Sequence, residues 1–470
     1  MQNRNYNKSK IVEITKSIFR EYDIRGVYPH QIDEEVVGNI AKAISIKCKK
    51  EGVNKICVGR DGRLSGESLL ETLSFSLSQY GLDVENIGMV TTPLLYFAAK
   101  KNKSKSGIMI TGSHNPKEYN GIKLVINDKP VSGNEIYKLI NTDIETSKKI
   151  GQIKYKDIKD EYVSEVVENI NLVSDKKIKV VIDCGNGSAG CIAPILFKKL
   201  GCEVIELYSD VDGNFPNHHP DPGKLENLKD LVTTVKSSNA DLGLAFDGDG
   251  DRVGLICDKG EVIFPDKILM MMSKDILQSK KGKIIFDVKC TNRLKDVILS
   301  YGGEPIMSPT GHFHIKKMLR KTDAHLAGEM SGHIFFNDDW YGFDDAHYSG
   351  FRLIKILIEN ESELSELLGE FPDGFTTPEI NLDVDEDKKF QIVDEFKKSA
   401  SFENASVSML DGLRVEYEDG WGLLRASNTT PKLVLRFEGT SQKSLDDIIR
   451  KFNDEFQKVH PNLDKIIDQI

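Results

Sequence analysis

A serine beside a histidine, in a loop that follows an apolar run, is the stretch of this sequence best suited to covalent chemistry. The apolar residues 107–110 predict a short buried strand. Gly112 frees the backbone of the following loop, and the Asn115-Pro116 pair indicates a turn rather than a helix start. Ser113 is therefore expected at the end of a strand, with His114 next to it.

A lysine on the next predicted strand adds a cation to this group. Residues 121–126 predict a second strand after a turn signal at Asn120-Gly121. If that strand returns beside the first, Lys123 comes back toward Ser113, and a hydroxyl, an imidazole and an ammonium group share one small volume. This combination suits nucleophilic or phosphoryl chemistry on Ser113. An ordinary polar loop between two strands is the alternative interpretation.

Three aspartates at alternate positions form the strongest metal-binding signal. Asp247, Asp249 and Asp251 are separated by single glycines, so their carboxylates can converge on one cation, and hard oxygen ligands favour Mg²⁺ or a similar divalent ion. An EF-hand is excluded because Arg252 and Asp258 occupy the positions that need glycine and glutamate. A structural acidic turn is the alternative, although three close carboxylates repel one another without a cation. Phosphate oxygens can complete a magnesium shell, so the loop also indicates a phosphorylated partner.

Other polar loops offer groups that could bind a sugar phosphate. Residues 425–431 combine a guanidinium, hydroxyls and an amide between two apolar runs, which suits a phosphate, although ordinary turn chemistry explains them too. Glu329 and Ser331 could bind vicinal sugar hydroxyls, and His333 either contacts a ligand or ends the loop. Lys289 follows an apolar strand and either meets an anion or is a surface lysine.

The composition excludes several classes of protein. The chain has 470 residues, 39% of them hydrophobic, and no apolar run approaches the roughly 20 residues of a bilayer span. The formal net charge of −10 argues against a nucleic-acid surface, and an anionic substrate must therefore be held by locally gathered Arg, Lys or metal. Seven cysteines without CxxC spacing, and a polar N-terminus without a signal-peptide core, predict a cytoplasmic protein without structural zinc or disulfides.

A threefold internal repeat predicts which elements position these loops. Residues 55–62, 179–187 and 283–292 each run from an apolar strand into a polar loop, and a helix, a second strand and a third strand follow. The third strands end at the serine loop, at the acidic loop and at the loop with Glu329. Strand–helix–strand order implies largely parallel sheets flanked by helices, with ligands at the carboxyl ends of the strands. We expect the three loops to share one cleft.

The predicted fold has three similar α/β domains with mixed, largely parallel sheets flanked by helices, plus a smaller C-terminal α+β domain, around a central cleft. The expected domains are residues 1–155, 156–258, 259–373 and 374–470. Residues 371–378 predict a linker before the last domain.

Two further segments have a less specific pattern. Residues 11–26 predict a strand or extended arm, from which Arg20, Tyr22 and Arg25 either line a site or form surface ion pairs. The charged run 383–389 predicts solvated surface.

Five stretches together resemble the α-D-phosphohexomutase family. They are residues 19–26, 111–116, 247–252, 328–333 and 425–431, and they follow the order of the family along nearly the whole chain. The family has three similar α/β domains and a fourth, smaller one around a central cleft, which agrees with the repeat.

The resemblance implies a role for each matching residue. Ser113 would carry a phosphoryl group, one oxygen of which would join Asp247, Asp249 and Asp251 around Mg²⁺. The residues expected to contact sugar hydroxyls are Glu329 and Ser331. Those expected to grip the phosphate that is not transferred are Arg425, Ser427, Asn428 and Thr429. Those similar to residues of the family's cleft are Tyr22, Arg25, Lys123, Arg252, Lys289, His312 and His333, and we add His114 as a substrate contact next to the serine.

The implied activity is reversible interconversion of hexose 1-phosphate and 6-phosphate, of mannose and glucose, through a hexose 1,6-bisphosphate. Lys123 or His312 is the expected proton shuttle, and Arg25 belongs to the same catalytic group. Mg²⁺ and the bisphosphate are the expected cofactors. Sugar phosphates are the expected partners, without nucleic acid or membrane, and a monomer is expected.

Three residues favour one branch of the family. Gly112, Gly250 and Met330 resemble phosphomannomutase/phosphoglucomutase, whereas phosphoglucosamine mutases usually have Ala, Ala and Gln there. A phosphoglucosamine mutase, a Mg²⁺-dependent sugar phosphatase and a non-enzymatic sugar-phosphate sensor are the alternative functions.

Overall fold

The chain folds into two compact units, which are described separately. The structure is a computed structural model that describes residues 14–172, 176–428 and 430–469. The first unit contains residues up to 90, 94–158 and 212–214, and the second contains residues 91–93, 159–211 and 215–470. Within the described residues the strands form four sheets, one in the first unit and three in the second.

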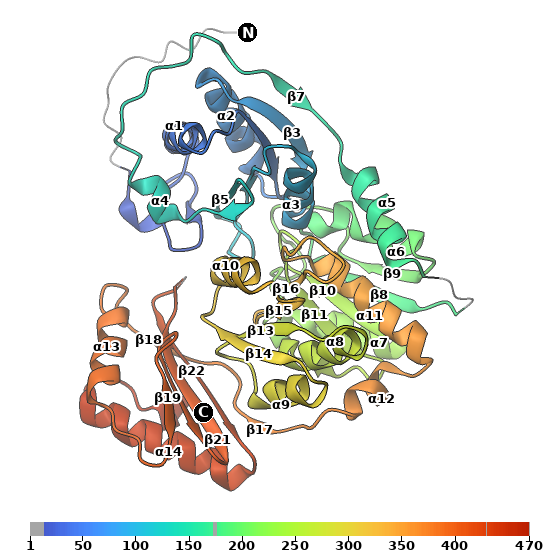
Figure 1. Ribbon diagram of the computed structural model, residues 1–470, viewed down its shortest axis with the longest axis vertical. Coiled ribbons are helices and arrows are strands. Elements are labelled where there is room, and N and C mark those ends of the chain that lie inside the picture. The colour runs from blue at the N-terminus through green and yellow to red at the C-terminus, as the bar shows by residue number, and fades with distance from the viewer. Residues whose placement is uncertain (1–13, 173–175, 429, 470) are drawn as a thin grey trace. The chain divides into compact units, whose positions relative to one another are not determined.

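The first unit is built on one mixed sheet (Figure 1). Its strands, in spatial order, are β1 (Ile24–Val27), β5 (Tyr119–Ile126), β4 (Gly107–Ile110), β2 (Lys55–Arg60), β3 (Asp83–Met89) and β7 (Ile153–Tyr155), with β6 (Lys129–Pro130) beside β5. Its helices are α1 (Glu34–Lys50), α2 (Gly66–Gln79), α3 (Thr92–Lys101) and α4 (Gly133–Tyr137), with a 3₁₀ turn at Lys16–Ile18. β4 runs parallel to β2 and antiparallel to β5, so the strand that carries Lys123 returns beside the strand before Ser113.

Alternation along the strands decides which side chains enter the core of this unit. Ile108 and Ile110 of β4 pack with Ile122 and Leu124 of β5 in the core under α1 and α2. Because successive side chains of a strand point to opposite faces, Lys123 leaves β5 on the face away from that core. Its Cα partner across the ladder is Met109, so the lysine lies one strand away from the segment that ends at the serine loop.

The second unit contains two sheets that repeat the strand order of the first (Figure 1). The strands of one sheet, in spatial order, are β12 (Val262–Ile263), β11 (Val253–Cys257), β10 (Leu242–Phe246), β8 (Lys179–Asp183) and β9 (Glu203–Leu207). Those of the next are β14 (Glu304–Ser308), β13 (Lys283–Asp287), β15 (Leu326–Gly328) and β16 (Ile334–Phe336). In both sheets the first repeated strand is central and parallel to the second and the third.

Helices of the second unit alternate with these strands. They are α5 (Lys159–Ile170), α6 (Ala193–Lys199), α7 (Lys229–Ser238), α8 (Pro265–Ser279), α9 (Asn292–Ser300), α10 (His312–Thr322), α11 (Ala346–Asn360) and α12 (Leu364–Gly369), with 3₁₀ turns at Ser188–Cys191 and Leu225–Leu228. α8 packs closely on β15, because a Cβ built on Gly328 would lie 2.4 Å from a methyl carbon of Leu269. This close approach explains the glycine at the end of β15.

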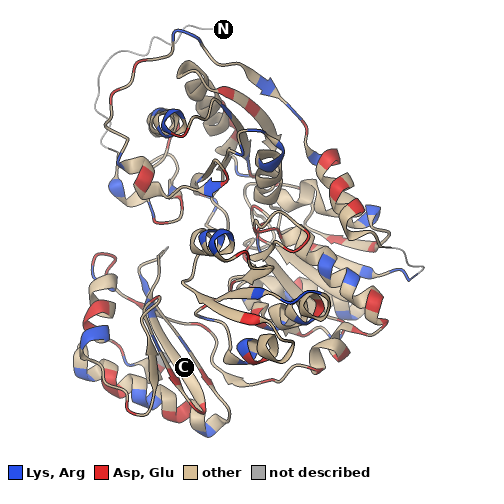
Figure 2. Ribbon diagram, in the orientation of Figure 1, with Lys and Arg blue, Asp and Glu red and all other residues tan. Residues whose placement is uncertain are grey.

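The last sheet is antiparallel and is covered by two helices. Its strands, in order, are β17 (Phe375–Thr376), β22 (Lys432–Gly439), β21 (Gly420–Ala426), β20 (Leu413–Tyr417) and β19 (Ser406–Ser408), with β18 (Ile380–Asp383) also paired to β22. α14 (Gln442–Val459) buries Ile448, Phe452 and Phe456 against it, and charged residues of both signs follow α14 and α13 (Lys389–Ser399) in Figure 2. A 3₁₀ turn, Ile466–Gln469, follows.

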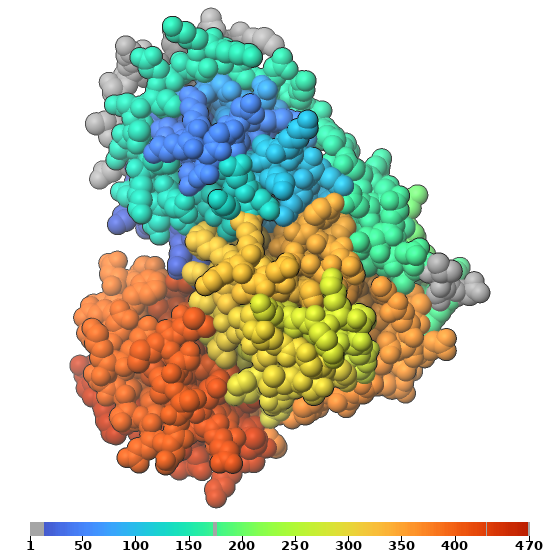
Figure 3. All heavy atoms as spheres, in the orientation of Figure 1, coloured from blue at the N-terminus to red at the C-terminus, as the bar shows by residue number. Residues whose placement is uncertain are grey.

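A buried arginine joins the last sheet to the preceding domain of the second unit. Figure 3 shows these two parts of the chain, orange and yellow, in contact. Arg414 is 1% exposed and its guanidinium lies 3.7 Å from the ring centre of Trp421. It donates hydrogen bonds to the carbonyls of Val288 and Cys290 and to the side chain of Asn292. These carbonyls belong to the loop after β13, so the last sheet is attached at the loop that contains Lys289.

Two expectations about the last domain are wrong in part. Residues 375–376, expected in a linker, pair as β17 with β22, because an extended segment satisfies its backbone groups best at the free edge of a sheet. Lys389, expected in solvated surface, is 1% exposed; its ammonium lies 2.7 Å from Glu386 and 3.1 Å from the carbonyl of Thr430. Among the described helices, none has the length and apolar character to cross a membrane.

Candidate active site

The serine loop holds its nucleophile candidate in an unusual backbone conformation. Ser113 follows β4, is 1% exposed and has φ of 49°, in the left-handed region that residues with a Cβ seldom adopt. Its backbone N–H donates to the hydroxyl of Thr111 at 2.8 Å. Its Oγ lies 3.3 Å from Nδ1 of His114. The loop therefore presents a hydroxyl beside an imidazole, as the sequence predicts.

Two cations of the first unit lie on the strands next to this loop. Arg25 of β1 is 5% exposed, and its guanidinium contacts Asp23 and the side-chain oxygen of Asn115, which belongs to the serine loop. Lys123 of β5 is 3% exposed. Tyr22, just before β1, is half-buried. The structure thus places Arg25 against the serine loop, His114 beside Ser113, and Lys123 on the strand next to β4.

A glycine lets β1 approach β5. A Cβ built on Gly121 would lie 2.2 Å from the carbonyl oxygen of Ile24. Arg25 pairs directly with Gly121 in the β1–β5 ladder, so this close contact fixes the strand that carries the arginine.

The acidic loop follows β10 in the second unit. Asp247, Asp249 and Asp251 are each 0% exposed. Asp247 organises the loop, because one of its oxygens accepts the backbone N–H groups of Asp251 and Arg252, each at 3.1 Å. Thr92, which is grouped with the second unit, donates its hydroxyl to Asp249 at 2.6 Å and its backbone N–H to the carbonyl of the same residue at 2.8 Å.

The acidic loop fits a hard divalent cation. One oxygen from each of the three carboxylates lies within 4.8 Å of the others, and all three residues are buried. Buried carboxylates remain ionised when hydrogen-bond donors or positive charge compensate them, and three that lie close together also repel one another. The guanidinium of Arg252, 3.9 Å from Asp247, and the imidazole of His333, 3.3 Å from Asp251, supply part of such charge for the three carboxylates. A donor set made only of oxygens favours Mg²⁺ over softer metals.

A second buried cluster lies next to the acidic loop and centres on His333. Its Nε2 lies 3.3 Å from Asp251 and 3.3 Å from Nε of Arg252, and its Nδ1 lies 3.1 Å from Glu329 and 3.0 Å from the hydroxyl of Ser331. Although burial opposes it, the carboxylate of Asp251, with that of Glu329, raises the pKa of His333 to about 9. Its imidazolium in turn lowers the pKa of Glu329 against the effect of burial. The sugar-binding candidates are thus coupled electrostatically to the metal loop.

His312 begins α10 and lies beside this cluster. The rings of His312 and His333 are 5.7 Å apart, and Nδ1 of His312 lies 3.9 Å from the carboxylate of Asp344. The ammonium of Lys316, one turn along α10, is 2.7 Å from the same carboxylate. Asp344 also meets Asp251 and His333 in a second group of potential metal ligands, although Lys316 already supplies it with positive charge.

Lys289, one of the residues expected in the cleft, is buried and is not a surface lysine. It is 7% exposed and its ammonium lies 3.0 Å from the carboxylate of Glu379. Although burial opposes it, the carboxylate of Glu379 raises the pKa of Lys289. The backbone N–H of Lys289 donates to Asp287, which ends β13.

The C-terminal loop presents a fixed arginine. Arg425, at the end of β21, is 4% exposed and donates through Nε to Asp411 at 2.9 Å. The same oxygen of Asp411 also accepts the backbone N–H of Thr310, at 2.9 Å, and this contact links the loop to the segment before α10. Ser427 is buried and accepts from the backbone N–H of Thr430 at 3.1 Å, whereas Asn428 is half-buried. The predicted contact Thr429 lies outside the described residues.

Each unit therefore assembles its own part of the predicted site. Ser113, His114, Arg25, Lys123 and Tyr22 belong to the first unit. The predicted site residues of the second unit are Asp247, Asp249, Asp251, Arg252, Lys289, His312, Glu329, Ser331, His333, Arg425, Ser427 and Asn428.

Several supporting residues were missed by sequence reasoning. They are Asp61 and Arg63 behind the serine loop, Thr92 beside the acidic loop, Lys316 and Asp344 beside His312, and Glu379 and Asp411 beside the basic residues. The repeat places the Asp61 loop in the same position as the Lys289 loop, and this is the signal that could have indicated a role for Asp61.

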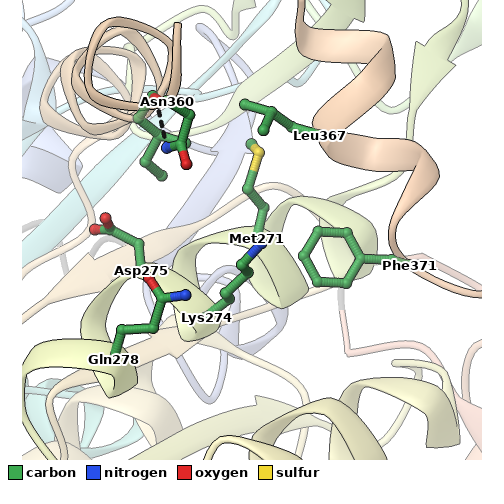
Figure 4. Close-up of a pocket in the computed structure, with 8 residues that line it drawn as sticks. Met271, Lys274, Asp275, Gln278, Asn360, Leu367 and Phe371 are labelled. Carbon is green, nitrogen blue, oxygen red and sulfur yellow. Dashed lines mark hydrogen bonds between the residues drawn. The ribbon is translucent and has the colours of Figure 1, made fainter. Parts of the chain in front are cut away.

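A small hollow in the second unit lies among α8, α11 and α12 (Figure 4). Met271, Leu367 and Phe371 form its apolar side, and Asp275 and Asn360 carry polar groups on the other. None of the predicted site residues is among the described residues that line it.

Comparison with known proteins covers nearly the whole chain. The family models that match are phosphoglucomutase/phosphomannomutase α/β/α domain I over residues 16–150, domain II over 160–260, domain III over 264–375 and the C-terminal domain over 379–455. The models follow one another along the chain in the order of the four sheets.

Individual relatives agree with the family models. The phosphomannomutase/phosphoglucomutase of Pseudomonas syringae pv. tomato is 50% identical, with 95% of this chain and 97% of that protein covered. The phosphoglucomutase of Neisseria gonorrhoeae is 45% identical, with 94% and 97% covered. A crystal structure of a phosphoglucomutase/phosphomannomutase family protein from Burkholderia thailandensis has a TM-score of 0.90 at 43% identity, covering 96% of this chain and 99% of that one.

Replacement of Asp249 by asparagine tests the metal site. Asp249→Asn keeps the size of the side chain and an oxygen that can accept from Thr92, but it removes one of three charges. We expect Mg²⁺ affinity to fall about tenfold or more, which corresponds to about 1.4 kcal/mol. Calorimetric titration of the metal-free protein measures this. The matched control is Asp339→Asn at an exposed position, and equal affinity in both variants would contradict the assignment.

Proposed function

The chain belongs to the phosphoglucomutase/phosphomannomutase family and is an enzyme of the isomerase class, and we propose that it interconverts the 1- and 6-phosphates of mannose and glucose through a phosphoserine at Ser113 and a hexose 1,6-bisphosphate. The observation that carries the proposal is a buried loop of three clustered carboxylates in a chain that also holds a serine in a left-handed turn. The first suits a cation that binds phosphate, and the second suits a covalent carrier.

In the proposed reaction, the phosphoryl group passes from Ser113 to the free hydroxyl of the sugar phosphate. The bond between phosphorus and Oγ breaks, a bond to the sugar oxygen forms, and the hydroxyl proton leaves to a base. The resulting bisphosphate then reorients by about half a turn in the site. The bond between the other phosphorus and its sugar oxygen breaks, Oγ forms a bond to that phosphorus, and the base returns the proton to the sugar oxygen. Transfer of this kind depends on in-line positioning and charge stabilisation more than on covalent chemistry.

Basic residues supply the proton transfer and part of the charge in this proposal. Lys123 and His312 are the candidates that take and return the hydroxyl proton, and the carboxylate of Asp344, 3.9 Å from His312, would favour the protonated form of the imidazole. Arg25 is the remaining candidate of the catalytic group and is fixed against the serine loop through Asn115. Arg252 and Lys289, both held beside carboxylates, would attract the phosphate groups of the substrate.

Asp247, Asp249 and Asp251, with an oxygen of the phosphorylated Ser113, are the proposed ligands of Mg²⁺. When bound, the ion would neutralise charge on the transferring phosphoryl group. Asp247 would also keep the loop in shape, because its carboxylate holds two backbone N–H groups of the loop.

The remaining candidates would bind the part of the substrate that does not react. Glu329 and Ser331 would accept and donate hydrogen bonds to sugar hydroxyls, while His114, His333 and Tyr22 would line the same space. The residues of the proposed phosphate clamp are Arg425, Ser427, Asn428 and Thr429. Because the sugar must bind in two orientations, this clamp would hold whichever phosphate is distant from Ser113. Sugar phosphates are the proposed partners, and a cytoplasmic monomer stays a prediction from sequence.

The choice of sugar is tested by parallel assays of mannose, glucose and glucosamine 1-phosphates. Mannose and glucose differ only in configuration at carbon 2, whereas glucosamine adds a positive charge there that is costly to bury without a partner. We expect comparable kcat/KM for the first two and a value at least about tenfold lower for the third. A preference for glucosamine 1-phosphate would favour the phosphoglucosamine alternative, and stoichiometric release of inorganic phosphate would favour the phosphatase.

Replacement of the serine tests the covalent carrier. Ser113→Ala should lower mutase turnover by about 10³-fold or more, because no other hydroxyl replaces the nucleophile. Intact-mass measurement after incubation with glucose 1,6-bisphosphate should show an added phosphate on the wild-type protein and none on the variant. Ser147→Ala, with a half-buried serine of the same unit, is the control. Full turnover in Ser113→Ala would refute the phosphoserine route. Binding of a sugar phosphate by the wild-type protein without any turnover would instead favour the sensor alternative.

Replacement of Arg425 tests the shared clamp. Arg425→Ala removes a charge-assisted contact of about 1.5–3 kcal/mol, so KM for the 1-phosphate and the 6-phosphate should both rise about 10- to 100-fold. Arg450→Ala, whose side chain is 64% exposed, is the control and should leave both values unchanged. An effect confined to one isomer would show that the two phosphates bind to different groups.

A further inference from the structure

One buried arginine binds backbone carbonyls along the whole serine loop. The side chain of Arg63 is 0% exposed and donates four hydrogen bonds to loop carbonyls. Nη2 donates to the carbonyls of Ser113 at 2.7 Å and Asn115 at 2.6 Å. Nη1 donates to those of Pro116 at 2.6 Å and Tyr119 at 2.9 Å. A single guanidinium thus spans the loop from the serine to the start of β5.

Asp61, at the end of β2, fixes that guanidinium and the beginning of the same loop. One of its oxygens accepts Nε of Arg63 at 3.2 Å, the hydroxyl of Thr111 at 2.7 Å and the backbone N–H of Gly112 at 3.2 Å. Its other oxygen accepts the backbone N–H of Arg63 at 3.0 Å. Because Asp61 is 1% exposed, water does not compete for these contacts.

The contacts act on both sides of the strained residue. Ser113 has φ of 49°, which is unfavourable for a residue with a Cβ unless the surroundings hold it. The hydroxyl of Thr111, which is bound to Asp61, accepts the backbone N–H of Ser113. Arg63 donates to the backbone carbonyl of Ser113. Asp61 and Arg63 therefore together set the direction in which Cβ and Oγ of Ser113 leave the backbone.

The arrangement is specific for arginine. A guanidinium offers five N–H donors in a rigid plane, whereas an ammonium offers three from a single point. A lysine at this position could keep the charge, but it could not bind Asp61 and four carbonyls together. The loop is also fitted to the guanidinium, since a Cβ on Gly112 would lie 2.5 Å from Cζ of Arg63.

We propose that Arg63, fixed by Asp61, is the positioning residue that holds Ser113 in the conformation from which its Oγ gives and takes the phosphoryl group. This role rests on the proposed function of Ser113. The four loop acceptors of Arg63 given above are backbone carbonyls, so it acts on the rate of transfer through the placement of Oγ rather than on the binding of the sugar phosphate.

The test compares Arg63→Lys with Arg60→Lys. Arg60 lies at the end of the same strand, donates to the carbonyl of Asp61 and lies 3.9 Å from Glu67, so its replacement is a matched change outside the loop. For Arg63→Lys we expect kcat to fall about 10²-fold, as for a displacement of about 1 Å, with KM within about threefold of wild type. The rate at which glucose 1,6-bisphosphate adds phosphate to Ser113, followed by intact mass, should fall by a similar factor. Arg60→Lys should change neither.

A second variant keeps the test decisive if Arg63→Lys does not fold. Asp61→Asn is nearly isosteric and removes the charge that orients the guanidinium, and it should lower kcat and the phosphorylation rate about tenfold with KM unchanged. Wild-type kcat and phosphorylation rate in a folded Arg63→Lys, or in Asp61→Asn, would overturn the positioning role. So would a loss that appears in KM alone. Absence of phosphate and turnover in the wild-type protein would instead refute the proposed function, and the positioning role with it.

Discussion

In two of the repeats, a buried aspartate at the end of the central strand accepts a hydrogen bond from the loop that follows the neighbouring parallel strand. Asp61 follows β2 and accepts the backbone N–H of Gly112 after β4. Asp287 ends β13 and accepts the backbone N–H of Met330 after β15. A carboxylate in such a position needs donors to offset its desolvation, and backbone N–H groups at the carboxyl ends of adjacent strands are the nearest ones. The same constraint therefore shapes the serine loop and the sugar-binding loop.

In the middle repeat the corresponding aspartate finds other donors, because the neighbouring loop is itself acidic. Asp183, the corresponding residue, binds Gly185 and His218 rather than the loop after β10. The acidic loop is held by its own first aspartate and by the backbone N–H of Ser188, which donates to the carbonyl of Gly248. A fourth carboxylate aimed into this loop would add to the repulsion among three. One strand–loop frame thus carries either a loop that is bound by an aspartate of the neighbouring strand or an acidic loop suited to a cation.

Two of the residues that favour the phosphomannomutase/phosphoglucomutase branch also have a packing reason in this chain. A Cβ on Gly112 would meet the guanidinium of Arg63, as described above. Gly250 has φ of 71°, and a Cβ there would lie 2.9 Å from Thr91 and 3.2 Å from the ring of His347. Alanine at either position would require its neighbours to move, so these glycines cannot be interpreted as markers of sugar preference alone.

The sequence by itself determined the repeated strands, the loops at their ends and the chemistry that those loops can perform, because apolar periodicity, glycine and closely spaced carboxylates act over a few residues. It also suggested that Lys123 could come back beside β4 if the next strand returned there, and the pairing of Lys123 with Met109 shows that it does. Only the tertiary structure decided that Arg63 spans the serine loop, that Lys289 is buried against Glu379 and that His333 joins the metal loop to the sugar-binding loop. These partners are distant in sequence, and a long side chain can reach many of them. Which one it binds depends on burial and on the direction of each donor, and these are properties of the packed chain.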